Sequence, residues 1–250
     1  MITKAIIPAA GKGTRLYPLT LTCSKEMIDV NGVPTIRYIV DEAINSGIKD
    51  IYLIINKNKK DIITYFDSLS DLKANIHYLY QEEQLGLGHA VLMAKDVIKD
   101  DYFACLLGDD LFDCPIPALK QVISVYEKYN TQVVGTLKVK DEFVHLYGSS
   151  KILDDNDPHS KVLLDIIEKP QGSFPSNYVS QGRYVLSNKI FDFLEKKEIG
   201  TGGEIQLTDS LSHYAKTYGS RISVIDGIRF DIGKLEDIEN AREYFKRKRI

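Results

Sequence analysis

Short apolar runs alternate along this chain with segments of helical period, and this alternation limits the possible folds more than any other feature. The apolar runs carry little charge, as strands that are covered on both faces of a sheet do. They lie at residues 4–8, 51–55, 76–80, 102–107 and 131–139. The segments of helical period lie at residues 35–46, 59–66, 88–97, 119–126 and 235–248. Such βαβ units predict a single Rossmann-like α/β domain, with a mostly parallel central sheet and helices on both faces.

Composition narrows the class of protein further. The net charge of -3 and the pI near 6.0 argue against a nucleic-acid partner, because binding to a phosphate backbone needs a clear basic excess. No apolar run approaches the roughly 20 residues that span a bilayer, so no membrane association is expected. Three cysteines without a CxxC pair indicate reduced thiols and a cytoplasmic location. Turn signals between residues 149 and 160 mark the segment that we expect to be least ordered.

A glycine-rich segment, Pro8-Ala9-Ala10-Gly11-Lys12-Gly13-Thr14-Arg15, directly follows the first predicted strand. Glycines there let backbone N–H groups approach a phosphate, and Lys12 and Arg15 add positive charge. A dinucleotide-binding loop would need a third glycine where Leu16 follows, and the Gly-Lys-Ser/Thr ending of a P-loop is also missing. The segment therefore indicates either a phosphate-binding loop of another kind or an ordinary turn between a strand and a helix.

Ten residues after Arg15 comes the stretch Ser24-Lys25-Glu26-Met27. A lysine near a phosphate-binding loop can neutralise charge on a departing pyrophosphate, although alone it reads as a solvated surface residue. Together the two stretches resemble the sugar-nucleotide pyrophosphorylases, in which a GxGTR loop is followed by a PKEM-type segment. Within that superfamily the sequence is most similar to the bacterial UTP–glucose-1-phosphate uridylyltransferases. Four further stretches carry this narrower resemblance, in the order of the family: Gly86-Leu87-Gly88-His89-Ala90-Val91, Ile167-Glu168-Lys169-Pro170, Ser176-Asn177 with Gly182-Arg183-Tyr184-Val185-Leu186, and Gly203-Glu204-Ile205-Gln206-Leu207-Thr208-Asp209.

The resemblance implies an enzyme that forms UDP-glucose, or a related UDP-sugar, and pyrophosphate from UTP and glucose 1-phosphate, with Mg²⁺ as cofactor. Small-molecule substrates and a homodimer are the partners it implies. It also divides the single domain, residues 1–250, into a nucleotide-binding part at about 1–135, a sugar-binding part at about 136–233 and a C-terminal helix at 234–250.

The resemblance implies a set of site residues as well. Arg15, Lys25 and Lys169 are the catalytic cations: the first two hold the β- and γ-phosphates, and the third bridges the phosphates. Gln81 and Gly86 match the pair that reads uracil, while Glu168 accepts hydrogen bonds from sugar hydroxyls. The full set of implied substrate contacts is Ala10, Gly11, Gly13, Glu26, Gln81, Gly86, Gly108, Glu168, Gly182 and Glu204.

Asp109 and Asp231 are implied as the ligands of the magnesium ion. A carboxylate at the C-terminal end of a buried parallel strand opens into the ligand crevice of an α/β sheet, which is where Asp109 is expected. Magnesium prefers one or two carboxylates together with substrate phosphates. A turn-forming role is the alternative for Asp109, and Asp110 and Asp113 are read as turn or cap residues.

Other functions stay open on the sequence alone. A thymidylyl- or cytidylyltransferase acting on a sugar 1-phosphate would share the phosphate-binding residues. A non-catalytic nucleotide-sugar-binding regulatory protein would share the fold, but such a binder has less need of two metal-binding acids. A Rossmann-type dehydrogenase is excluded by the missing third glycine.

Overall fold

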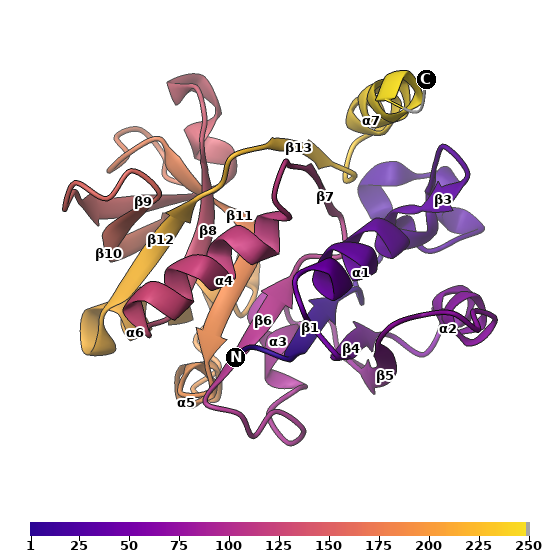
Figure 1. Cartoon of the computed structure of the whole chain (residues 1–250), viewed down its shortest axis with the longest axis horizontal. Helices are drawn as coiled ribbons and strands as arrows, with labels where there is room; N and C mark the ends of the chain where they lie inside the picture. The colour runs from indigo at the N-terminus through magenta and orange to yellow at the C-terminus, as the bar shows by residue number, and fades with distance from the viewer. Residues whose placement is uncertain (249–250) are drawn as a thin grey trace.

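The chain folds around a nine-stranded sheet with the strand order β5-β4-β1-β6-β11-β8-β12-β10-β9 (Figure 1). The computed structural model describes residues 1–248. The strands of the sheet are β1 (Lys4–Pro8), β4 (Asp50–Ile55), β5 (Asn75–Tyr80), β6 (Tyr102–Leu106), β8 (Val133–Lys138), β9 (Gly148–Leu153), β10 (Ser160–Glu168), β11 (Tyr178–Ser187) and β12 (Ser220–Val224). The α-helices are α1 (Thr35–Asn45), α2 (Lys60–Asp67), α3 (Leu87–Leu92), α4 (Ala118–Tyr129), α5 (Ile190–Leu194), α6 (Leu207–Tyr218) and α7 (Leu235–Lys248). The predicted α/β class and single domain are confirmed.

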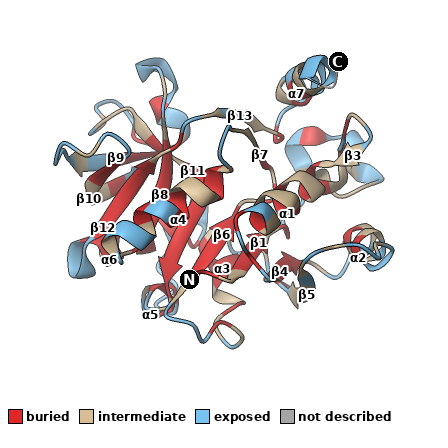
Figure 2. Cartoon of the chain, in the orientation of Figure 1, coloured by how far each residue is buried: buried red, intermediate tan, exposed pale blue. Residues whose placement is uncertain are grey.

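Helices cover both faces of the sheet. One hydrophobic cluster packs α1, α2 and α4 onto one face, and a second packs α3, α5 and α6 onto the other. Ile6 of β1 belongs to the second cluster and Ile7 to the first, because successive side chains of a strand point to opposite faces. Figure 2 shows the strands as a buried layer between partly exposed helices. The uninterrupted apolar run of β1 follows from this double burial.

The two halves of the sheet differ in strand direction. Strands β5, β4, β1 and β6 pair in parallel, as the βαβ pattern predicts. Beyond β6, strand β11 runs antiparallel to β6 and β8, and β10 runs antiparallel to β12 and β9. The pairing of β11 with β8 is irregular between Ser180 and Tyr184. The expectation of a mostly parallel sheet thus fits the N-terminal half, because apolar runs reveal strands but not the direction in which distant strands pair.

The segment between residues 149 and 160 differs from the expectation that it lacks regular structure. It is not the least ordered part: β9 and β10 form an antiparallel hairpin in which Leu153 lies opposite Val162. The turn signals are real, because Asp154 Oδ1 accepts the N–H of Asn156 at 2.9 Å. The strand beside them was missed because its buried residues include polar Ser149 and Ser150. Helix α3 is also shorter than expected, since it ends at Leu92 and turns follow it.

Two small ribbons complete the fold. Strand β7 (Asp110–Asp113) pairs antiparallel with β13 (Ile228–Asp231), and β2 (Asp29–Val30) with β3 (Val33–Pro34). Short 3-10 helices lie at Thr14–Leu16, Leu19–Leu21, Lys25–Met27, Asp141–Leu146 and Thr201–Gly203. No helix within residues 1–248 combines the length and apolar character needed to cross a membrane. Cys23, Cys105 and Cys114 are all free thiols.

Helix α7 closes the chain and packs beside these ribbons. Its Ile238 joins a third hydrophobic cluster with Ile232, which directly follows β13. Tyr244 Oη donates to Asp113 Oδ2 at 2.7 Å, and Lys248 Nζ donates to Asp113 Oδ1 at 2.5 Å. Asp113 was read as a turn or cap residue, and it instead anchors this helix. Residues 249–250 of the helix expected at 234–250 lie outside the described residues.

Candidate functional site

The glycine loop, residues 9–15, leaves β1 at the carboxyl edge of the parallel half. Gly13 adopts a left-handed conformation with φ of 67°, and a Cβ there would lie 3.0 Å from Thr20 Cγ2. Thr20 Oγ1 donates to the carbonyl oxygen of Gly13 at 2.8 Å. Glycine is therefore required at this position both by the backbone conformation and by the close approach of Thr20.

Two amide side chains that the sequence analysis did not single out hold the start of the loop. Asn56 Nδ2 and Gln84 Nε2 donate to the carbonyl oxygen of Ala10, at 2.9 and 2.8 Å. Asn56 directly follows β4, at the same sheet edge as the glycine loop, and this position was an available signal. Gln84 lies in the loop between β5 and α3, where no periodicity distinguishes it.

Lys25 and Asp109 lie face to face across the end of β1. Lys25 Nζ donates to Asp109 Oδ2 at 2.5 Å, and it lies 3.6 Å from the position that a Cβ on Gly11 would take. The N–H of Gly108 donates to the carbonyl oxygen of Pro8 at 3.3 Å, which sets Asp109 beside the loop. The structure thus brings together the glycine loop, the lysine and the first acid that the sequence singled out.

Glu26 is placed differently from the expectation. Its side chain is 0% exposed, and its Oε2 accepts from Lys59 Nζ at 2.5 Å. The side chain of Glu26 therefore holds Lys59 beside the loop, and its expected contact with a substrate stays a prediction. Within residues 1–248, its second oxygen, Oε1, has no hydrogen-bond partner. Lys59 was missed because its partner lies 33 residues away in the chain.

Burial and neighbouring charges shift the pKa values of Lys25, Asp109 and Glu26 in opposite directions. Burial raises the pKa of Asp109, but Lys25 outweighs burial and holds that pKa below its ordinary value. Burial lowers the pKa of Lys25, but Asp109 and Glu26 outweigh burial and raise it overall. Lys25 and Asp109 are therefore both charged at neutral pH. For Glu26 burial is the larger effect, and its pKa is raised.

The second expected metal ligand, Asp231, lies beside the first through the β7–β13 ribbon. The N–H of Ile232 donates to the carbonyl oxygen of Asp109 at 2.9 Å. Asp231 Oδ1 accepts the N–H of Gly233 at 2.8 Å. Arg15 reaches the same place, because a Cβ on Gly233 would lie 3.1 Å from Arg15 Nη2. Two acids and a cation from three distant segments therefore meet at one edge of the sheet.

Asp110 is a further correction. It was read as a turn or cap residue, but it is 3% exposed and its Oδ1 accepts from Arg229 Nε at 2.9 Å and from Arg229 Nη2. Its carbonyl oxygen accepts from Arg183 Nη2 at 2.7 Å. The fully buried Arg183 is paired in turn with Glu42. The sequence carried no local signal for this network, because Arg229 lies 119 residues from Asp110.

A cavity of about 130 Å³ opens beside these acids, and Glu168 and Gly182 line it. Glu168 Oε2 accepts from Thr208 Oγ1 at 2.8 Å, and Lys169 Nζ lies 3.5 Å from Glu168 Oε1. The side chain of Lys169 is 49% exposed, so it is accessible to a ligand. Gly182 has φ of 66°, and a Cβ there would overlap the carboxylate of Asp110.

Gln81, Gly86 and Glu204 form a separate group. Gln81 Nε2 donates to the carbonyl oxygen of Gly86 at 3.1 Å and lies 3.0 Å from His89 Nδ1. Gly86 has φ of 108°, and a Cβ there would lie 2.8 Å from Glu204 Cβ. Glu204 therefore lies next to Gly86, while the lining of the 130 Å³ cavity is formed by other residues.

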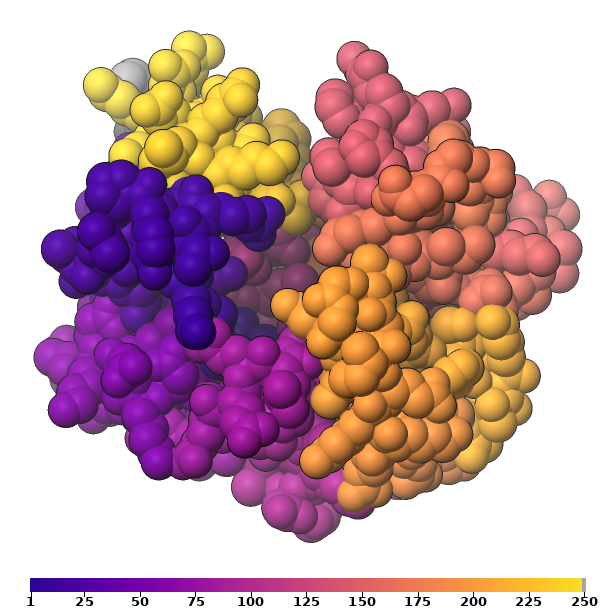
Figure 3. All heavy atoms as spheres, turned by 180° about the vertical axis from the view of Figure 1, so that it is seen from behind, coloured from indigo at the N-terminus to yellow at the C-terminus, as the bar shows by residue number. Residues whose placement is uncertain are grey.

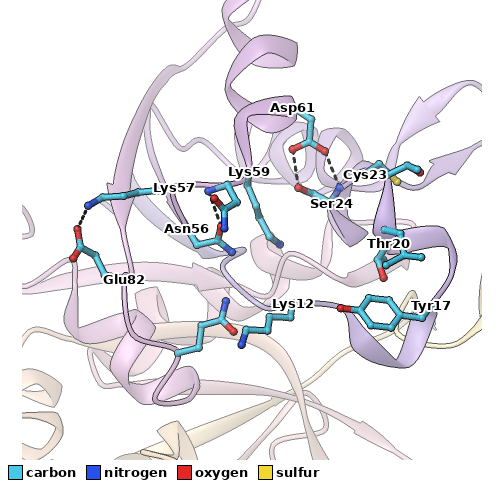
Figure 4. A pocket seen from close by; sticks show the side chains of 14 residues that line it. Lys12, Tyr17, Thr20, Cys23, Ser24, Asn56, Lys57, Lys59, Asp61 and Glu82 are labelled. Atoms are coloured by element: carbon cyan, nitrogen blue, oxygen red, sulfur yellow. Dashed lines mark hydrogen bonds and ion pairs between the residues drawn. The ribbon is translucent and has the colours of Figure 1, made fainter.

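A larger cavity of about 660 Å³ lies beside the glycine loop. Lys12 from the loop and Lys59 from the start of α2 line it, together with Asn56, as Figure 4 shows. Ser24 and Asp61 lie in its wall and are bonded to each other, since Ser24 Oγ donates to Asp61 Oδ1 at 2.7 Å.

Figure 3 shows a hollow at the centre of one face, bordered by the N-terminal segment in indigo, the C-terminal segment in yellow and an orange segment near residue 200.

The donor set suits a cation that is shared with substrate phosphates. Asp109 is ionised, and Asp231 lies beside it through the ribbon. Within residues 1–248, no group of three or more His, Cys, Asp or Glu side chains could hold a metal ion by itself. Such a pair of carboxylates matches the preference of magnesium for few protein ligands, and it does not match a closed metal cage.

Comparisons with known proteins agree with this geometry. The sequence matches the family described as nucleotidyl transferase over residues 4–248. A UTP–glucose-1-phosphate uridylyltransferase of Staphylococcus saprophyticus is 39% identical over 257 residues, which cover 93% of this chain and 88% of the relative. A structure of UDP-glucose pyrophosphorylase complexed with UDP-glucose has a TM-score of 0.94 and 32% identity, and the match covers 99% of this chain and 100% of that one. The UTP-bound UDP-glucose pyrophosphorylase of Acinetobacter baumannii has a TM-score of 0.86 and 32% identity, covering 98% and 93%. The chain therefore belongs to the nucleotidyl transferase family and, within it, to the bacterial UTP–glucose-1-phosphate uridylyltransferases.

Proposed function

We propose that the protein forms UDP-glucose and pyrophosphate from UTP and glucose 1-phosphate, with Mg²⁺ as cofactor. One observation carries the proposal: Lys25 Nζ lies 2.5 Å from Asp109 Oδ2, directly at the glycine loop. A charged lysine and an ionised carboxylate at a phosphate-binding loop suit a reaction between two anions. The uridylyltransferase relatives, aligned over nearly the whole chain, support the same reaction and the same substrates.

Nucleotidyl transferases generally use a divalent metal. Asp109 and Asp231 would hold it together with substrate phosphates. When bound, the ion would neutralise phosphate charge and orient the α-phosphate. In this structure Lys25 Nζ binds the carboxylate of Asp109. We infer that the two groups separate when substrates bind, so that Lys25 turns to the triphosphate and Asp109 is released for the cation.

The remaining residues position the two substrates. An oxygen of the sugar phosphate attacks the α-phosphorus, and the bond from that phosphorus to the bridging oxygen of the β-phosphate breaks, which releases pyrophosphate. Arg15 and Lys25 would stabilise the charge on the leaving group, and Lys169 would hold the attacking phosphate. No protein nucleophile is required for this in-line transfer.

The two substrate pockets are proposed from the residue roles that the family resemblance implies. Backbone groups of Ala10, Gly11 and Gly13 would meet the nucleotide, and Gln81 with Gly86 would read the uracil edge. The cavity at Glu168 and Gly182 would take the sugar, with Glu204 and Gly108 at its approaches. The nucleotide part would span about residues 1–135 and the sugar part about 136–233. We also propose a homodimer and a cytoplasmic location, which sedimentation and fractionation can test.

One assay tests the reaction directly. The protein is incubated with Mg²⁺, glucose 1-phosphate and each of UTP, TTP, CTP and ATP in turn, and pyrophosphate release is measured. We expect release with UTP above all others. Greater release with TTP or CTP would transfer the proposal to that nucleotide. No release with any of the four nucleotides, despite binding of UDP-glucose, would overturn it in favour of a regulatory nucleotide-sugar-binding protein.

A further inference from the structure

Arg229 forms part of the wall of the 130 Å³ cavity, and its role goes beyond the residues discussed so far. Its side chain is 12% exposed. The Nε donates to Asp110 Oδ1 at 2.9 Å, the Nη1 to Tyr147 Oη at 3.4 Å, and the Nη2 lies 3.6 Å from Asp231 Oδ2. One guanidinium therefore contacts a buried acid, a tyrosine of the cavity wall and the second proposed metal ligand.

The rest of the cavity lining is unfavourable for an anion. Asp110 and Glu168 both contribute carboxylates, and among the described lining residues Arg229 alone carries positive charge. A sugar 1-phosphate brings up to two further negative charges. Moving a charge out of water without a partner is costly, and like charges at close range add to that cost. With a neutral side chain in place of Arg229, the cavity would repel a phosphorylated sugar.

We propose that Arg229 determines the specificity of this cavity for a phosphorylated acceptor. Its Nε and Nη2 offset the charge of Asp110, and its Nη1, whose bond to Tyr147 Oη is long at 3.4 Å, donates to the phosphate of the acceptor, while Glu168 faces the neutral sugar hydroxyls. This inference rests on the proposed function and adds a residue to it. The selection is for the phosphate of the acceptor and not for the nucleotide, because Arg229 lines the cavity at Glu168 and not the one at the glycine loop.

The surroundings fix Arg229 before any substrate arrives. Strand pairing sets it opposite Phe112, and its guanidinium carbon lies 5.3 Å from the centre of the Tyr147 ring. Tyr147 also holds the backbone of Lys169, because its carbonyl oxygen accepts the N–H of Lys169 at 3.1 Å. A charge held in place in this way needs no rearrangement when the phosphate binds, which increases its effect.

Two substitutions test the inference. Arg229→Gln removes the charge, and Arg229→Lys keeps the charge but loses the planar guanidinium with its several N–H donors. We expect Arg229→Gln to raise the KM for glucose 1-phosphate by about ten- to a hundredfold, the scale of a lost charged hydrogen bond, and Arg229→Lys to raise it less. The KM for UTP changes less than the KM for glucose 1-phosphate in both variants. Calorimetric titration measures the same difference without turnover, since the affinity for UDP-glucose falls more than the affinity for UTP.

Arg221→Gln is the matched control. Arg221 Nη2 donates to Asp155 Oδ2 at 2.6 Å, and its guanidinium carbon lies 3.6 Å from the centre of the Tyr129 ring. Its side chain is 9% exposed, close to the 12% of Arg229, but it is not part of the cavity lining. We expect the control to lose stability while both KM values stay as in the wild type. Equal changes in the Arg229 and Arg221 variants would overturn the inference.

A double variant, Arg229→Gln with Asp110→Asn, separates recognition from folding. It removes both charges, so no unpaired acid stays buried, and it keeps the test available if Arg229→Gln alone does not fold. We expect it to regain stability and still show the raised KM for glucose 1-phosphate. A return to the wild-type KM would mean that Arg229 only neutralises Asp110, which overturns the inference. If the wild type itself releases no pyrophosphate, the proposed function fails first, and calorimetry distinguishes the two failures.

Discussion

The site contains two ion pairs that differ in how firmly they are held. Lys25 and Asp109 are 17% and 22% exposed and meet through a single hydrogen bond. Arg229 and Asp110 are 12% and 4% exposed, and Asp110 is bound in addition by the buried Arg183 through its carbonyl oxygen. In the first pair, Lys25 is proposed to bind the triphosphate and Asp109 to bind the metal ion. The Arg229–Asp110 pair is a fixed part of the interior. Lys25 and Asp109 can therefore exchange partners, while Arg229 and Asp110 stay paired.

The largest expected effect tests the fixed side. Arg183→Met should lower the free energy of unfolding by about 3–5 kcal/mol, because it leaves the carboxylate of Glu42 without its buried partner. Urea denaturation followed by circular dichroism measures it. Arg37→Ala is the control, since Arg37 pairs with Asp41 at the surface and such pairs contribute about 0–1 kcal/mol. Equal losses in the two variants would contradict the fixed network.

The second prediction concerns the exchangeable pair. Lys25→Met and Asp109→Asn should each lower kcat by about 10²–10³, the scale of one lost electrostatic group. Their effects on Mn²⁺ binding without nucleotide should have opposite signs. Lys25→Met tightens it, because the lysine no longer competes for the carboxylate, and Asp109→Asn weakens it. Titration followed by electron paramagnetic resonance gives both affinities, and Lys25→Met with unchanged Mn²⁺ affinity would rule out the exchange.

The smallest effect concerns Asp113, on the same strand as Asp110 but outside the site. Burial raises the pKa of Asp113, but hydrogen bonds from Lys248 and Tyr244 outweigh it and lower the pKa overall. A lowered pKa in the folded state stabilises the protein above the unfolded value of about 3.9, and this contribution is lost as the pH falls. Asp113→Asn should therefore flatten the fall in unfolding free energy below about pH 5. It should leave kcat unchanged.

That third experiment also supplies a control for the second. Asp113 and Asp109 are four positions apart, yet Asp113 binds helix α7 and Asp109 faces the glycine loop. A drop in kcat for Asp113→Asn comparable to that for Asp109→Asn would show that disturbance of β7, and not loss of a particular carboxylate, causes the inactivation.

The sequence predicted what local patterns encode. Strand β1 begins and ends where expected, and the glycine loop and Lys25 meet as their spacing implied. Helix α7 matches residue for residue within the described part of the chain. These features follow from apolar period, glycine position and charge order within a few neighbouring residues.

What the sequence missed depends on partners far apart in the chain. In the sequence, Arg229 and Lys59 do not differ from other charged residues. Arg229 gains its partner when β13 pairs with β7, and Lys59 gains its partner when the start of α2 packs beside Glu26. Strand β11 was not predicted, and its antiparallel pairing also depends on distant partners, since a strand's own residues do not state the direction of its neighbours. The ion pairs of Arg229 and of Lys59 are both buried, where the choice of partner is a property of the completed fold.

The irregular stretch of β11 between Ser180 and Tyr184 has a consequence for how the chain can change in length. It sets Gly182 against Asp110 and directs Arg183 into the interior. Inserting or deleting one residue there would turn Arg183 to the opposite face of the sheet and remove its contact with Glu42. The middle strand of the sheet therefore tolerates no shift in register. The hairpin turn around Asn156 is restricted in a different way, because Asp155 accepts from Arg221 and Asp157 accepts from Tyr129.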